Sequence, residues 1–219
     1  MQLIKEVKFL IGKELLLEWR SKYALSGVIL YVVSTIFVCF LSFVTLQGAA
    51  WNVVFWIIML FASINTVSKS FLQETKGRQL YIYTIASPIA LILSKTIYNV
   101  ILMLLVTLIA LAFYSLVFDY LPQDMLLYIV AVILGSISFS TIFTMISAIA
   151  SKAGNGGMLM AILSFPVIIP VIGMLIKLSR NAVDGLDRSV SLDEIAILLT
   201  INVLVIASSL LLFPYLWRD

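Results

Sequence analysis

The chain has 219 residues, of which 63% are hydrophobic and 11% are charged, with a mean hydropathy of +1.15 and a formal net charge of +3. A soluble domain carries roughly 25% charged residues, so this composition cannot cover a water-exposed surface and excludes a soluble enzyme. Histidine, the commonest metal ligand and general base, is absent, and the single cysteine, Cys39, excludes an intrachain disulfide. The composition predicts an all-α integral membrane protein.

Residues 1–22 predict an amphipathic helix. Its hydrophobic residues recur at helical spacing and form one apolar stripe, made of Leu3, Ile4, Val7, Leu10 and Ile11. Because Lys5, Lys13 and Arg20 fall on the opposite side, we expect the helix to lie along the cytoplasmic membrane interface. The charges in this segment leave no uncharged core of signal-peptide length, so we expect no cleavable signal.

Glu14 and Glu18 continue the positions of the apolar stripe, which leaves two interpretations. In the first, the helix ends in a solvated turn where Glu18 pairs with Lys22 at i, i+4 spacing. In the second, the helix leaves the membrane at this point to contact a partner or the next cytoplasmic loop. Both interpretations are open at this point.

Ionisable residues divide the rest of the chain into apolar segments near the roughly 20 residues that a spanning helix requires. The six predicted spans are 24–46, 51–69, 89–118, 125–150, 158–177 and 195–216. Residues 1–219 then form one transmembrane domain, without a second domain or an internal repeat. The segment 178–193 is too long for a tight turn, and its charges suggest a short helix at the outer interface.

Lys and Arg residues are distributed unevenly between the two sides that these spans define. One side holds eleven of them and the other holds three, namely Lys177, Arg180 and Arg188. Cytoplasmic loops carry the excess of Lys and Arg, so both termini are predicted to be cytoplasmic.

The longest cytoplasmic connection between spans runs from Lys69 to Pro88. A hairpin needs only a few residues, so this segment is large enough to dock a partner. The alternative is a surface helix under the lipid headgroups, in which Tyr81 and Tyr83 would join an aromatic belt.

Two spans carry polar stripes at helical spacing. The fourth span contains Ser136, Ser140 and Thr144, and the second contains Ser63 and Thr66. Small hydroxyl residues let membrane helices approach closely, so packing is one explanation and a substrate-lining wall is the other. Since no charged residue is expected deep in any span, an ion-coupled pump is disfavoured.

Pro166 and Pro170 lie one turn apart in the fifth predicted span. Each proline removes a backbone donor and clashes with the preceding turn. The pair predicts either a structural kink, which membrane helices tolerate, or a broken or re-entrant helix near the outer leaflet.

Several catalytic signatures are missing from the sequence. It contains no P-loop, no His-Glu-x-x-His and no Cys-x-x-Cys, and its net charge is explained by orientation signals rather than by a nucleic-acid-binding patch. We therefore expect a transport-type or assembly-type membrane subunit that does not supply its own energy and binds no nucleic acid.

Three motifs, in order and at matching spacing, resemble CcmB, the haem exporter protein B permease of cytochrome c maturation. The first is the acidic-basic segment 13–20. The second motif consists of Phe71, Glu74, Gly77, Leu80, Pro88 and Lys95, and the third of Lys152, Gly156, Gly157, Leu159, Pro166 and Pro170. The resemblance covers nearly the whole chain. Lys76 and Arg78 make the loop less acidic than in many relatives, which bears on partner recognition.

The resemblance implies the membrane half of an ABC transporter in a bacterial cytoplasmic (inner) membrane. Its partners would be a CcmA-like ATPase that binds ATP, a CcmC-like membrane subunit, a CcmE-like haem chaperone and a second permease half, identical or different. The loop would then be an ATPase-coupling helix, with contacts from Phe71, Gln73, Glu74, Gly77, Arg78 and Leu80, beside the interfacial residues Glu14, Glu18 and Arg20. The chain itself would hold no cofactor or metal, and haem is a candidate cargo.

The implied function is coupling of ATP hydrolysis either to haem export or to release of the haem-loaded chaperone. Because the chain has no histidine, it offers haem no imidazole ligand, which favours the mechanical role. One alternative is an ABC permease that exports a lipid, glycan or drug. Another is a membrane assembly scaffold that works without an ATPase.

Overall fold

The computed structural model describes residues 2–21, 23–43, 45–67, 86–151 and 156–218. Within these ranges the chain is helical and contains no strand. The helices are α1 (Gln2–Ser21), α2 (Tyr23–Ser42), α3 (Gly48–Val67), α6 (Pro88–Phe118), α7 (Met125–Ala150), α8 (Gly156–Val183), the short 3-10 helix η1 (Arg188–Ser191) and α9 (Leu192–Arg218).

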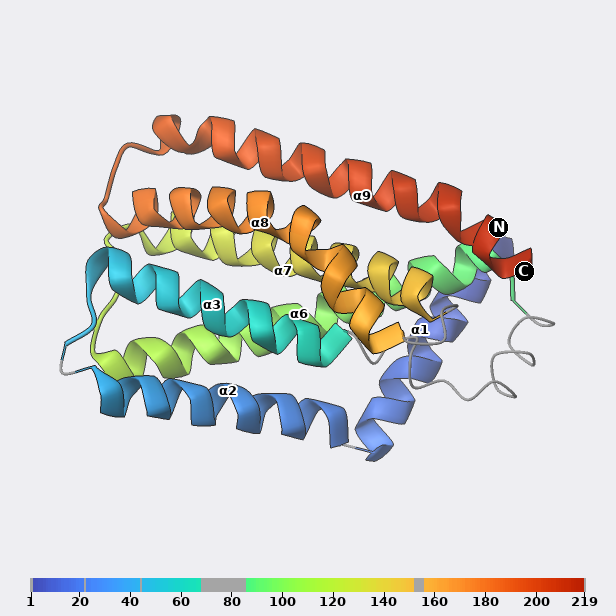
Figure 1. Ribbon diagram of the computed structural model, residues 1–219, viewed down its shortest axis with the longest axis horizontal. Coiled ribbons are helices and arrows are strands. Elements are labelled where there is room, and N and C mark those ends of the chain that lie inside the picture. The colour runs from blue at the N-terminus through green and yellow to red at the C-terminus, as the bar shows by residue number, and fades with distance from the viewer. Residues whose placement is uncertain (1, 22, 44, 68–85, 152–155, 219) are drawn as a thin grey trace.

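Six of these helices, α2, α3, α6, α7, α8 and α9, are long and apolar enough to cross a membrane. The predicted fold class, an all-α membrane protein with six spans preceded by an N-terminal helix, is confirmed. The spanning helices run alternately in opposite directions, and both termini lie at one end of the bundle (Figure 1). We call this end the terminal end and the opposite one the distal end.

The α7 helix is the centre of the bundle. It packs against α3, α6, α8 and α9. Of the residues in its membrane-spanning stretch 72% are buried, compared with 17% for α2. Close approach requires small residues on α7. A Cβ atom at Gly135 would lie 2.5 Å from ring atoms of Trp56, so only glycine fits under this indole.

A buried aromatic cluster closes the distal half of the bundle. The rings of Trp51 and Tyr114 lie 4.9 Å apart, and the Tyr114 hydroxyl donates to the Trp51 carbonyl oxygen over 2.9 Å. Phe55 and Tyr128 pack on the same group. Because these residues come from α3, α6 and α7, the cluster joins three helices that the sequence pattern could not place together.

The α8 helix differs from the predicted span 158–177. It continues to Val183, because the charges that were expected to end it have partners: the Lys177 ammonium lies 2.7 Å from the Glu194 carboxylate, and Arg180 pairs with Asp184. Pro166 and Pro170 lie inside this continuous helix, which changes direction midway (Figure 1). The described helix is therefore bent rather than broken.

Gly135→Ala should destabilise the protein by about 1–3 kcal/mol, because the new methyl group overpacks the contact with Trp56. Gly27→Ala on α2 is the matched control, since a Cβ atom there meets nothing within 4 Å and alanine favours a helix by about 1 kcal/mol. Unfolding in detergent micelles measures both effects. Equal stability of the two variants would contradict this account of the α3–α7 contact.

Candidate functional site

The predicted coupling residues Phe71, Gln73, Glu74, Gly77, Arg78 and Leu80 lie outside the described residues. The structure does describe the helix that follows this segment. Ser87 is the N-cap of α6, where its hydroxyl accepts from the Ala90 N–H, and Pro88 occupies the first turn. Proline suits this position because its missing N–H would have no helical partner there. The start of α6 is thus fixed by local chemistry.

The first turns of α1 hold this starting point from outside. A carboxylate oxygen of Glu6 accepts from the Ser87 hydroxyl over 2.8 Å and from the Ser87 backbone N–H over 3.2 Å. Hydrogen bonds to a charged acceptor contribute roughly 1.5–3 kcal/mol each. The point at which the chain enters α6 is therefore attached to α1 as well as to its own helix.

Glu14 and Glu18 extend the same attachment along α6. The Glu14 carboxylate lies 3.8 Å from the ammonium of Lys95, whose side chain is 3% exposed. The Glu18 carboxylate accepts from the Tyr98 hydroxyl over 3.2 Å and from the Leu25 N–H over 2.8 Å. We call the contacts of Glu6, Glu14 and Glu18 with α6 the carboxylate seam.

The carboxylate seam gives the two acidic residues partners on α6 that the sequence analysis did not foresee. Glu14 and Glu18 bind α6, the third spanning helix, whereas the predicted pairing of Glu18 with Lys22 falls outside the described residues. The side chain of Arg20, the third residue expected at this interface, is not among those described.

The apolar stripe of α1 packs on protein at its centre, not on lipid as expected. Val7 and Leu10 are buried in a cluster with Leu91 of α6, Ala148 of α7 and Phe213 of α9. Its edges differ, because Ile4 is 72% exposed. Buried apolar surface stabilises by about 25 cal/mol per Å², so this cluster adds to the seam in fixing α1 on the bundle.

The polar stripe of the fourth span faces α6. Ser140 donates to the Asn99 carbonyl oxygen over 3.0 Å, the Asn99 amide donates to the Thr144 hydroxyl over 2.8 Å, and the Ser136 and Thr107 hydroxyls lie 3.2 Å apart. All of these residues are buried. The contacts are those of helix packing. Asn99 was missed in the sequence analysis, although an amide inside an apolar run was the signal for it.

Polar side chains of the second span, α3, form hydrogen bonds of two kinds. Some reach α8, and others go to backbone carbonyl groups of α3 itself. Asn52 donates to the Ile176 carbonyl oxygen over 3.0 Å, and the Trp56 indole N–H donates to the Ser179 hydroxyl over 2.7 Å. Ser63 and Thr66 donate to carbonyl groups of α3 itself. Neither stripe is seen to line an open path.

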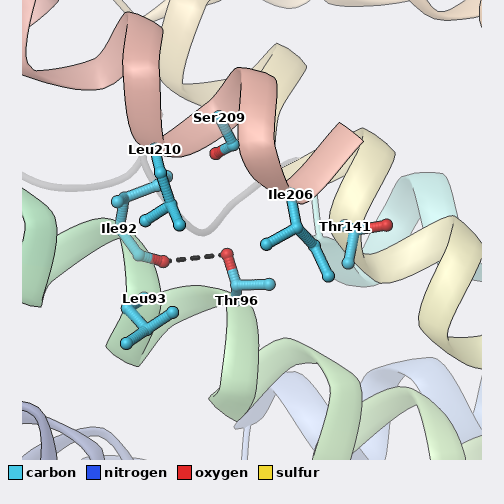
Figure 2. A pocket seen from close by; sticks show the side chains of 7 residues that line it. All are labelled: Ile92, Leu93, Thr96, Thr141, Ile206, Ser209 and Leu210. Atoms are coloured by element: carbon cyan, nitrogen blue, oxygen red, sulfur yellow. Dashed lines mark hydrogen bonds between the residues drawn. The ribbon is translucent and has the colours of Figure 1, made fainter. Parts of the chain in front are cut away.

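A hollow between α6, α7 and α9 has room for about 10 Å³ (Figure 2). Its lining includes Thr96, Thr141 and Ser209, and the Thr96 hydroxyl donates to the Ile92 carbonyl oxygen at its edge. A second hollow, between α2 and α6, has the same volume. A volume of this size holds about one water molecule. Neither of these two hollows has room for a larger solute in this conformation.

The distal end is held together by Asp124 and Arg188. The carboxylate of Asp124 accepts two hydrogen bonds from the guanidinium, over 2.6 and 3.0 Å, and a third from the Leu127 N–H at the start of α7. The guanidinium and this N–H lower the pKa of the Asp124 carboxyl from 3.8 to about 2. The loop before α7 is thereby attached to η1.

The family model described as CcmB protein matches residues 5–215. The chain belongs to the CcmB family. CcmB chains are ABC permease subunits of cytochrome c biogenesis, so the six spanning helices are those of a multi-pass membrane permease. No curated protein sequence matches the chain.

Replacing Glu14 by leucine in this CcmB chain should destabilise it by roughly 1–3 kcal/mol, because the buried Lys95 ammonium loses a carboxylate partner. Adding Lys95→Met should recover part of the loss, since no buried cation is then left. Unfolding of the two single variants and the double variant in micelles gives the coupling energy. Purely additive effects would show that the two charges do not interact.

The Asp124–Arg188 contact should make stability depend on acid. Because the pKa of Asp124 is lower in the folded state, its contribution is fully present above about pH 4 and is lost as the pH falls toward 2. The gap in unfolding temperature between the natural chain and Asp124→Asn should therefore narrow between pH 5 and 2.5. Arg188→Gln should behave alike and add nothing to Asp124→Asn. A gap independent of pH would contradict the contact.

Proposed function

We propose that this chain is the permease half that couples ATP hydrolysis on a CcmA-like ATPase to haem handling in cytochrome c maturation. The ATPase would bind ATP and dock on segment 69–87 at the terminal end, which would face the cytoplasm of a bacterial inner membrane. The chain itself would carry out no catalysis and hold no cofactor.

The observation that carries this proposal is the carboxylate seam. Segment 68–85 leads directly into Ser87, and Glu6 binds Ser87 from α1. A force applied to that segment would reach α1 and α6 together, and through Asn99 it would reach the central helix α7. This arrangement suits transmission of movement from a motor outside the membrane to the core of the bundle.

The absence of histidine supports a mechanical role over passage of haem through this chain. Haem would find no imidazole ligand in a chain without histidine. We therefore propose that the movement releases a haem-loaded CcmE-like chaperone at the distal end, together with a CcmC-like subunit. A second permease half would complete the transporter.

Glu74→Lys and Gly77→Ala should each leave the chain in the membrane but lower ATPase stimulation and c-type cytochrome assembly together, because both lie in the proposed docking segment. Co-purification with the ATPase, followed by both activity assays, measures the effect. Asp187→Lys makes the same charge reversal as Glu74→Lys at the distal end and should leave ATPase stimulation unchanged.

Unchanged ATPase stimulation and cytochrome assembly in both variants would refute the docking segment. The side of the membrane has its own test: in a Cys39→Ser background, Gly77→Cys should resist a membrane-impermeant thiol reagent applied from outside the cell. A deletion strain with normal c-type cytochromes and an accumulated lipid, glycan or drug would instead favour another exported substrate.

A further inference from the structure

A lateral groove opens between the end of α1, the first half of α2 and α6. It encloses about 660 Å³. Its walls are aliphatic, with Ile29, Leu30 and Val33 contributed by α2 and Ile101, Leu102 and Leu105 by α6. The groove lies at the outside of the bundle, within the part of the two helices that is apolar enough to span the membrane.

The groove is polar at one end only. Glu18 and Tyr98 line it at the terminal end, where the Tyr98 hydroxyl donates to the Glu18 carboxylate. From there the walls are apolar toward the middle of the bundle. Leu25 and Val33 are eight residues apart, which at 1.5 Å per residue corresponds to about 12 Å. This length fits within one leaflet, whose hydrocarbon is roughly 15 Å thick.

We propose that the groove binds an acyl chain of a phospholipid from the leaflet at the terminal end. The headgroup would lie beside Glu18 and Tyr98, and the chain would run along the aliphatic walls. A phospholipid matches the groove, because both have a polar group at one end and a longer apolar part beyond it. The inference concerns the bilayer alone and goes beyond the proposed function.

Other occupants fit the groove less well. A non-helical peptide would bring unpaired backbone groups into hydrocarbon. Water is not retained by aliphatic walls that offer it no partners. A flexible hydrocarbon chain carries no polar group that the aliphatic walls would leave unpaired.

The test uses the full chain in vesicles of phosphatidylethanolamine and phosphatidylglycerol, doped with a phospholipid that carries a photoactivatable diazirine in one acyl chain. After irradiation, mass spectrometry locates the labelled peptides. We expect label concentrated on the groove walls of α2 and α6, and a bound phospholipid retained after purification in detergent.

Ile101→Trp and Leu105→Trp enlarge side chains inside the groove and should reduce both signals several-fold. Leu116→Trp is the matched control on the same helix, because Leu116 is 77% exposed but does not line the groove. The control should label and retain lipid as the natural chain does, and all variants should unfold at similar temperatures.

Two results would overturn the proposal. Label spread evenly over the exposed faces of α2, α6 and α9 would show ordinary lipid contact without a bound chain. In a Cys39→Ser background, an efficient disulfide between two copies carrying Leu30→Cys would show that protein covers the groove. Cytochrome assembly is not a readout here, so failure of the lipid site leaves the proposed function standing.

Discussion

The absence of water inside a bilayer is the constraint on which this structure depends. Each hydroxyl and amide in a spanning helix must find its partner within the protein, because an unpaired group in hydrocarbon costs several kcal/mol. The serine and threonine residues of α7 meet that requirement by facing α6 or their own carbonyl groups.

The same constraint identifies the places where the described residues fall short of it. Both amide atoms of Asn202, one carboxylate oxygen of Glu194 and the indole N–H of Trp51 are buried without a hydrogen-bond partner. Asn202 and Glu194 lie on α9, which is one of the less buried spanning helices. Polar groups left unpaired in one arrangement of helices favour any other arrangement that pairs them.

Hydropathy predicted the number and type of the spans because charges interrupt the apolar runs. It placed the end of α8 six residues early, since a charged residue such as Lys177 can stay in a helix when a neighbour such as Glu194 neutralises it. Pairing of this kind depends on residues distant in sequence. The aromatic cluster around Trp51 was missed for the same reason.

The position of α1 shows a different limit of sequence analysis. An apolar stripe looks the same whether it packs on lipid or on protein, so Val7 and Leu10 could not reveal their environment. Glu14 and Glu18 held the missing information, because two carboxylates aligned with an apolar stripe require donors on whatever that stripe covers. The donors, Lys95 and Tyr98, are 80 or more residues away in sequence.

The paired prolines weaken the backbone hydrogen bonding of α8 at one defined place. Pro166 cannot donate to the carbonyl of Ile162, and Pro170 cannot donate to that of Pro166, so two successive carbonyl groups along one line of the helix have no helical donor. On the distal side of this point, Asn52 and Trp56 fasten the helix to α3. The half that begins at Gly156 can therefore change its angle to the other half of α8, which stays attached to α3.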